Sequence, residues 1–323
     1  MQYGSGELNL SWFALSMSLG IISISAFDLH LHYLSIAFLL ADIVSTSFLC
    51  LYFTVETIAN YRYISCRRPE CRFGVFNALA GAAILTVRLS LSVPRIPLAA
   101  VYFLLLFLVM SIVLARPRFP VSIRNDNGKV DTMFTIFPVA MLAVVIAVMA
   151  LSENPLFLII SFAIGIFSIS SFFIFQSRFI ASLLSSGLKG VVISGAIFIN
   201  FGFPALSAIF LNDFSLTSLA VRIPGMAPDL VLIARIFWIW ATLLIIPVAG
   251  IYLARRSGFY FSTVKLSMVF PAAVYSVSTF VLFRTFGEVF VMISAASLLL
   301  SISMLTALIV EIILNGPQKQ GHS

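Results

Sequence analysis

The sequence predicts an all-α integral membrane protein with ten transmembrane helices. Hydrophobic residues make up 61% of the 323 positions and charged residues only 10%, a balance that suits a lipid bilayer and is foreign to a water-soluble domain. A spanning helix takes about 20 mostly apolar residues. A chain of this length with short loops therefore supplies about ten spans and has no room for a separate soluble domain.

Charged residues, prolines and glycines divide the apolar sequence into ten segments. In chain order, these segments cover approximately residues 9–27, 33–57, 73–90, 96–115, 133–151, 156–177, 190–212, 230–254, 262–283 and 289–311. Residues 1–315 then form a single transmembrane domain, and residues 316–323 form a short C-terminal tail. The first segment lacks a basic start and a small-residue cleavage site, so we expect it to be retained as a helix.

The loops between these segments alternate in their content of Lys and Arg. Of the 19 basic residues, 14 lie on one side of the predicted topology, with the largest groups at residues 62–72 and 116–129. The positive-inside rule places that side in the cytoplasm. The sequence therefore predicts a multi-pass protein of the cell membrane with both termini cytoplasmic.

Loop lengths pair the segments into five helical hairpins. The connections after the first, third, fifth and ninth segments are short, so each odd helix is expected to pack against the even helix that follows it. The first helices of the pairs begin near residues 9, 73, 133, 190 and 262. This spacing of about 60 to 70 residues is typical of a repeated structural unit.

A Phe-Pro dipeptide occurs within three odd segments, as Phe137-Pro138, Phe203-Pro204 and Phe270-Pro271. Proline removes one helical hydrogen bond and clashes with the preceding turn, so a kink is expected at each pair. Lipid cannot satisfy the freed carbonyl, which favours a position that lines a central cavity. Gly202 adds to the expected break in the seventh segment. Chance placement is the alternative, because proline is more frequent in membrane helices than in soluble ones.

The odd segments also contain small and hydroxyl residues. Examples are Ser16, Ser18, Gly20 and Ser23 in the first segment, Asn77 and Gly81 in the third, and Ser276, Ser278 and Thr279 in the ninth. Such residues could give a central path a neutral polar lining. They equally allow close packing between helices, and the sequence leaves both interpretations open.

Charged residues within or beside the spans are candidates for function because they are costly in lipid. Asp42 lies deep in the second segment and could relay protons, although a structural hydrogen bond or ion pair would also explain it. Lys265, Arg88 and Arg284 lie near the ends of odd segments, where they could attract anions. Alternatively, these long side chains reach the membrane interface simply to keep their charges in water.

Other classes of protein find little support. The basic residues are scattered between apolar runs, which argues against nucleic-acid binding. His30 and His32 lack a third ligand, and Cys66 and Cys71 have no histidine nearby, so we expect no metal site. The familiar hydrolase and nucleotide-binding motifs are missing, and the chain contains only 12 acidic residues. We expect neither a cofactor nor an enzymatic activity.

Three local motifs resemble the slow-type anion channel, tellurite-resistance and dicarboxylate transporter family. The run FSTVKLSMVFP at residues 261–271 resembles the ninth helix of that family, with Phe-Ser followed by Phe-Pro. Gly202-Phe203-Pro204 is similar to a break in the seventh helix, and residues 12–25 resemble the family's first helix. The chain departs from the family at Lys265 and Leu266, where an aromatic pair would be expected.

The resemblance implies a pore formed by the odd helices, an outer ring of even helices, and three protomers with one pore each. It implies conduction of a small inorganic or organic anion, with Phe270 at the gate and Phe137 and Phe203 as further gate candidates. The alternative is a proton-coupled carrier that imports a C4-dicarboxylate or exports sulfite or tellurite. A membrane enzyme or receptor is a third, more distant class. The expected partners are a small anion, membrane lipid and two further copies of the chain.

Overall fold

The computed structural model describes residues 12–59, 69–92, 130–131, 135–187, 191–192, 195–254, 266 and 268–315. Within these ranges the chain is almost entirely helical. Nine of the ten predicted segments correspond to described helices, while the predicted segment 96–115 lies outside the described residues.

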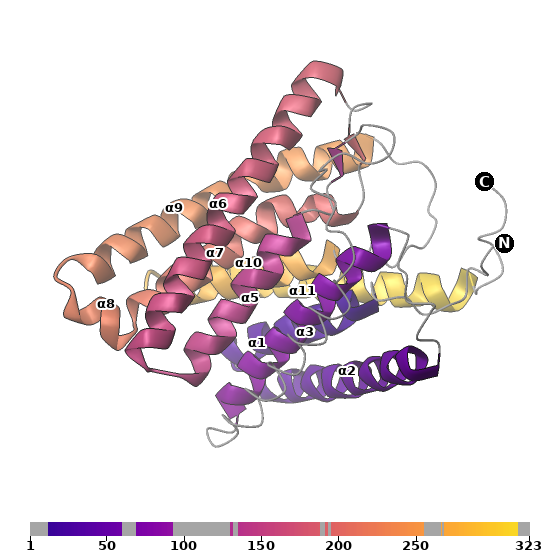
Figure 1. Ribbon diagram of the computed structural model, residues 1–323, viewed down its shortest axis with the longest axis horizontal. Helices are drawn as coiled ribbons and strands as arrows, with labels where there is room; N and C mark the ends of the chain where they lie inside the picture. Colours follow the sequence, from indigo (N-terminus) through magenta and orange to yellow (C-terminus); the bar gives the residue numbers. More distant parts are fainter. Residues whose placement is uncertain are drawn as a thin grey trace.

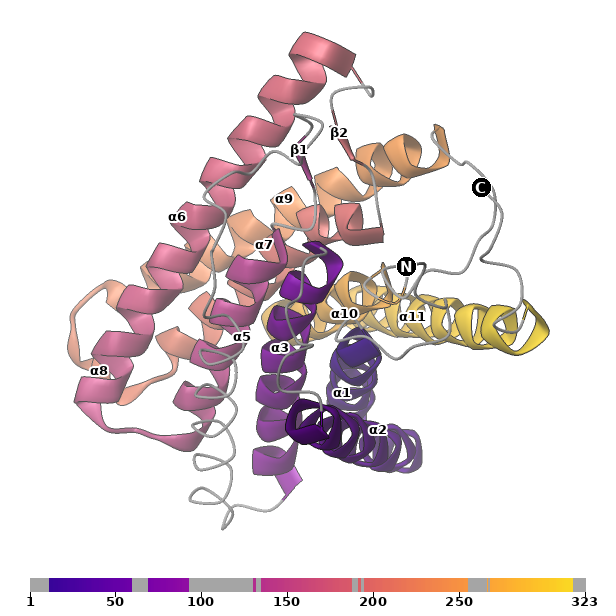
Figure 2. The same cartoon turned by 45° about the vertical axis from the view of Figure 1, so that its right-hand side comes forward.

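Four long helices lie at the periphery of the molecule (Figures 1 and 2). They are α2 (His32–Ala59), α6 (Pro155–Ser186), α9 (Met226–Ala254) and α11 (Glu288–Asn315), each of 28 to 32 residues. Among the described residues, these four helices are long and apolar enough to cross a membrane. Their outward faces expose large apolar side chains such as Phe48, Phe167, Leu243 and Leu299. Surfaces of this kind are stable against lipid and would aggregate in water.

The remaining long elements are α1 (Phe13–Asp28), α3 (Pro69–Ser92), α5 (Ile136–Leu151), α7 (Ile199–Ser215) and α10 (Val269–Phe283). Four of these five contain only 15 to 17 residues, the exception being α3 with 24. Almost every residue of α7 and α10 is buried. An apolar helix that is buried on all sides belongs to the interior of a bundle. The long helices therefore form an outer layer around short inner ones.

The five inner helices contact one another in a closed ring. Helix α1 packs against α3, α3 against α5, α5 against α7, α7 against α10, and α10 against α1. The outer helices join this ring as sequence neighbours, with α2 packed on α1, α6 on α5, α9 on α7 and α11 on α10.

The N-terminal ends of several inner helices differ from the prediction. Residues predicted as the start of the seventh helix instead form β2 (Val191–Val192), which pairs in parallel with β1 (Val130–Asp131), followed by the 3-10 helix η4 (Gly195–Phe198). The β-branched Val191 and Val192 between two glycines disfavour α-helix. In the ninth segment, α10 begins at Val269, while the predicted start near residue 262 lies outside the described residues. A further short helix, α8 (Ser218–Arg222), links α7 to α9.

Glycine residues, which have no side chain, allow the closest contacts between helices. A Cβ atom added at Gly165 of α6 would lie 2.3 Å from Cζ of Phe210, so the Phe210 ring of α7 occupies the space that glycine leaves. Between α1 and α3, a Cβ at Gly81 would lie 3.0 Å from Oγ of Ser16. Close backbone approach at small residues is the main way in which membrane helices gain packing energy.

Candidate functional site

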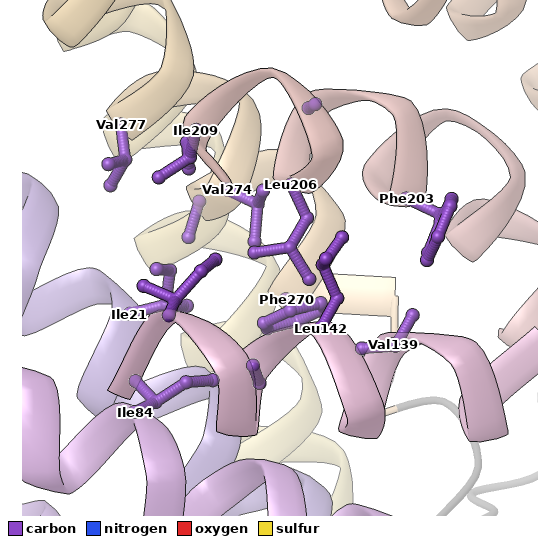
Figure 3. Packing of buried hydrophobic residues seen from close by; sticks show 14 of the residues in the cluster. Ile21, Ile84, Val139, Leu142, Phe203, Leu206, Ile209, Phe270, Val274 and Val277 are labelled. Carbon is purple, nitrogen blue, oxygen red and sulfur yellow. The ribbon is translucent and has the colours of Figure 1, made fainter. Parts of the chain in front are cut away.

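Apolar side chains from all five inner helices meet at the centre of the ring (Figure 3). Phe270 of α10 lies there among Val139 and Leu142 of α5 and Leu206 of α7, and none of its surface is exposed. Ile21 of α1, Ile84 of α3, and Ile209, Val274 and Val277 extend the same buried cluster. Aliphatic side chains from the inner helices therefore pack around the Phe270 ring.

Several hydroxyl groups of the inner helices connect the inner and outer layers. Ser23 of α1 donates to the carbonyl of Ser35 on α2 at 2.7 Å, and Thr279 of α10 accepts from the indole of Trp238 on α9 at 2.8 Å. Ser276 donates to the carbonyl of Ser294 on α11 at 2.7 Å. For these residues the packing interpretation holds, because their hydroxyls tie the two layers together.

The three Phe-Pro pairs occupy two different positions in their helices. Pro204 lies inside α7, as expected. Pro138 and Pro271, however, are each the third residue of their helix, in α5 and α10. Proline is tolerated in a first turn because the amide there has no helical partner to lose. The expectation of mid-helix kinks at Pro138 and Pro271 is therefore corrected: these prolines stand where the helices begin.

Gly202 and Pro271 bring two of these helix breaks into direct contact. A Cβ at Gly202 of α7 would lie 2.6 Å from Cβ and 2.9 Å from Cα of Pro271 on α10. No side chain larger than hydrogen fits at position 202 without separating the two helices. Since Phe270 precedes Pro271 in the chain, the position of the Phe270 ring depends on this contact.

The other two phenylalanines of the Phe-Pro pairs contact different partners. Phe203 is fully buried, and its ring stacks on Phe172 of outer helix α6 with centroids 4.2 Å apart. Phe137 lies edge-on to Phe76 of α3, at 5.2 Å between centroids. Phe203 thus contacts the outer layer through Phe172, while Phe270 lies among Val139, Leu142 and Leu206 (Figure 3).

Asp42 is completely buried between α1, α2 and α3. Its Oδ1 atom lies within hydrogen-bond distance of the hydroxyl oxygens of Ser16, at 2.6 Å, and Thr46, at 3.0 Å. Its Oδ2 atom has no hydrogen-bond partner and lies where a side chain at Gly20 would be, 2.7 Å from the added Cβ. Asp42 therefore joins an outer helix to the ring, and half of its bonding capacity is unused.

Arg88 is also buried, with 2% of its surface exposed. Its Nε atom donates to Ser23 at 2.9 Å, Nη2 donates to Ser35 at 2.7 Å, and Nη1 donates to Ser92. Its guanidinium lies 4.6 Å from the centre of the Phe27 ring. These contacts fasten α1, α2 and α3 together. The N–H groups of Arg88, a residue that the sequence suggested could attract anions, thus donate to serine hydroxyls.

Arg284 caps the C-terminal end of α10 and is exposed, 5.8 Å from the centre of the Phe280 ring. Lys265 lies outside the described residues. Asp28 at the end of α1 lies close enough to Asp213, Arg284 and Arg88 to interact electrostatically with each of them. The ring topology brings these residues, which lie at or near the ends of four inner helices, close to Asp28. Sequence spacing alone could not show this arrangement.

Comparison with known proteins agrees with this architecture. A sequence model of the voltage-dependent anion channel family matches residues 7–313, which is nearly the whole chain. No curated protein matches the chain significantly. In the described part of the chain, no group of three or more His, Cys, Asp or Glu side chains could hold a metal ion. The match confirms the resemblance seen in the sequence: the chain belongs to the voltage-dependent anion channel family, whose members are multi-pass membrane channels and transporters that move anions.

Proposed function

We propose that the chain is an anion channel whose path follows the axis of the ring formed by α1, α3, α5, α7 and α10, and that Phe270 blocks this path. The observation that carries the proposal is the complete burial of Phe270 among aliphatic side chains of the ring. A hydrophobic constriction excludes water and therefore ions until its side chains move apart. Because the path offers no fixed charge at this level, it would bind an anion weakly and favour rapid passage.

The surroundings of Phe270 support a gate that is held by packing. The side chains of Val139, Leu142 and Leu206 surround the ring, and the contact between Gly202 and Pro271 fixes the start of α10. Rotation of the Phe270 side chain needs space that these neighbours occupy. We propose that opening involves a separation of α10 from α7. We further propose that the chain has five helical hairpins and cytoplasmic termini, and that three copies assemble into a trimer.

Phe270→Ala tests the gate. Removing the ring takes away the bulkiest side chain in the constriction, so anion flux into liposomes should rise at least tenfold, which corresponds to about 1.4 kcal/mol in the barrier. Phe203→Ala is the matched control, since Phe203 is equally buried in a ring helix but stacks on α6. Each substitution should destabilise the fold by about 3 to 5 kcal/mol.

The two variants separate a gate from a general loss of packing. The gate requires a large rise in flux for Phe270→Ala and little change for Phe203→Ala. Equal flux in both folded variants, at the wild-type level, would show that Phe270 does not obstruct the path. Substitution of the anion in the same liposomes then ranks chloride, nitrate, sulfite and dicarboxylates.

A second candidate is a proton-coupled carrier for a C4-dicarboxylate, sulfite or a tellurium oxyanion. The buried carboxyl of Asp42 favours it, because coupling to protons needs a group that can bind one inside the membrane. Accumulation of the anion against its own gradient, driven only by a pH difference, would identify the carrier. Current that follows the electrochemical gradient of the anion at every pH difference would identify the channel.

A further inference from the structure

The seam between α1, α2 and α3 contains a small polar cluster that the proposed path does not use. Three oxygen atoms form a closed triangle: Oδ1 of Asp42, Oγ of Ser16 and Oγ1 of Thr46. The two hydroxyl oxygens are 2.5 Å apart, and they lie 2.6 and 3.0 Å from the carboxyl oxygen. All three residues are buried, with at most 2% of their surfaces exposed.

The hydroxyl protons of Ser16 and Thr46 are too few to give each contact in this triangle its own hydrogen bond. Three oxygen-oxygen contacts of hydrogen-bond length require three protons, whereas the hydroxyls of Ser16 and Thr46 supply two. A proton on Asp42 completes the cycle, because Asp42 then donates to Ser16, Ser16 to Thr46, and Thr46 to Asp42. An ionised carboxylate would leave one of the three contacts without a hydrogen.

The burial of Asp42 also favours its protonated form. The Oδ2 atom of Asp42 has no hydrogen-bond partner, and an ionised carboxylate that is buried with an unsatisfied oxygen is costly in a protein interior. Arg88 is no direct counter-ion, because it bonds to Ser35, which lies seven residues and thus about 10 Å before Asp42 along α2. The other titratable side chains described on these helices are also distant along the chain. Asp28 is at least seven residues from Ser16 on α1, and four residues of α2 are at least seven residues from Asp42: His32, Tyr33, Cys50 and Tyr52.

The cluster lies next to a residue of the ring at Gly20. A Cβ at Gly20 would lie 2.7 Å from Oδ2 of Asp42 and 2.9 Å from Cγ2 of Ile84. The unpaired oxygen and the Ile84 side chain thus both pack against α1 at Gly20, a residue without a side chain. Ile84 belongs to the apolar cluster at the centre of the ring (Figure 3).

We propose that Asp42 is a proton-binding site that controls anion conduction, with the proton bound in the conducting protein and its release inhibiting conduction. This rests on the proposed path along the ring axis. Loss of the proton would place a negative charge one helix layer, about 10 Å, from that path. At an effective dielectric constant of about 20, such a charge slows the passage of an anion about tenfold. Because the site lies in a closed seam, the proton stays in place and does not travel with the anion.

Two measurements on purified protein in liposomes test the proposal. Infrared difference spectra between the wild type and Asp42→Asn should show the C=O stretch of a protonated carboxyl at neutral pH, and the band should disappear at alkaline pH. Over the same pH range, wild-type anion flux should fall about tenfold. Asp42→Asn carries no charge at any pH and should keep the high flux throughout. Asp28→Asn is the control, since it removes an aspartate outside the triangle and should retain the infrared band.

Each result has a definite meaning. A spectrum in which Asp42→Asn removes no band would refute the bound proton. If the anion flux of Asp42→Asn keeps the wild-type pH dependence, the Asp42 proton does not control conduction. If the wild type accumulates the anion when driven by a pH difference and Asp42→Asn does not, Asp42 relays protons and does not hold a fixed one. A wild-type protein without anion flux at any pH would refute the proposed function and the control of conduction together, whereas the infrared band would still decide whether Asp42 holds a proton.

Discussion

Gly202→Ala changes the contact that holds the proposed gate. The added Cβ would lie 2.6 Å from Cβ of Pro271, whereas ordinary contact begins at 3.4 Å. Helices α7 and α10 must therefore separate by about 0.8 Å at this point, since the backbone Cα atom of Pro271 also lies only 2.9 Å from the added Cβ. Overpacking of this kind costs about 1 to 3 kcal/mol. Because Phe270 precedes Pro271, the ring shifts relative to Leu142 and Leu206, and we expect anion flux to rise.

The matched control is Gly250→Ala, because an added Cβ at Gly250 of α9 meets no atom within 4 Å. Alanine has the higher helix propensity by about 1 kcal/mol, so this variant should be at least as stable as the wild type. Thermal unfolding in detergent and flux into liposomes are measured for both. If Gly202→Ala matches Gly250→Ala in both stability and flux, the contact with Pro271 neither limits the packing nor positions the gate.

Two further substitutions test the structural assignments. Gly165→Ala would bring a Cβ to 2.3 Å from the Phe210 ring, so we expect a loss of about 1 to 3 kcal/mol in stability; an unchanged unfolding temperature would show that the ring moves aside freely. Arg88→Met removes the donors to Ser23 and Ser35, and each hydrogen bond lost within the membrane costs about 0.6 to 2 kcal/mol. We expect Arg88→Met to unfold at a lower temperature and to keep the salt dependence of flux of the wild type. A variant that is fully stable but shows reduced flux at low salt would instead support the role of Arg88 in attracting anions.

The sequence predicted where helices lie better than where they end. The outer helix α6 begins at Pro155 against an expected start near residue 156, but it continues to Ser186, beyond the expected end near residue 177. The prediction failed at the start of α7, where apolar residues continue but the α-helix does not. Hydropathy registers burial and cannot distinguish a buried helix from a buried strand or turn.

The candidate site was only partly predictable. The Phe-Pro pattern identified Phe270, yet nothing in the pattern separated it from Phe203, because that distinction depends on which face of each helix meets the ring. The hydroxyls were ambiguous for the same reason: Ser23 and Thr279 could serve as lining or as packing until their partners on α2 and α9 were known. The triangle around Asp42 depends on residues 26 and 30 positions apart, which no local motif reports.

The short inner helices also have an electrical consequence. Helix α5, with 16 residues, spans about 24 Å, less than the roughly 30 Å of hydrocarbon in a bilayer. Membrane voltage falls mainly across the part of a path that water and mobile ions do not fill. On the proposed path this is the apolar zone around Phe270, where an anion would experience most of the potential, about 2.3 kcal/mol per 100 mV. The current could then depend on voltage without any charged helix that moves, because the permeating anion is itself the charge on which the field acts.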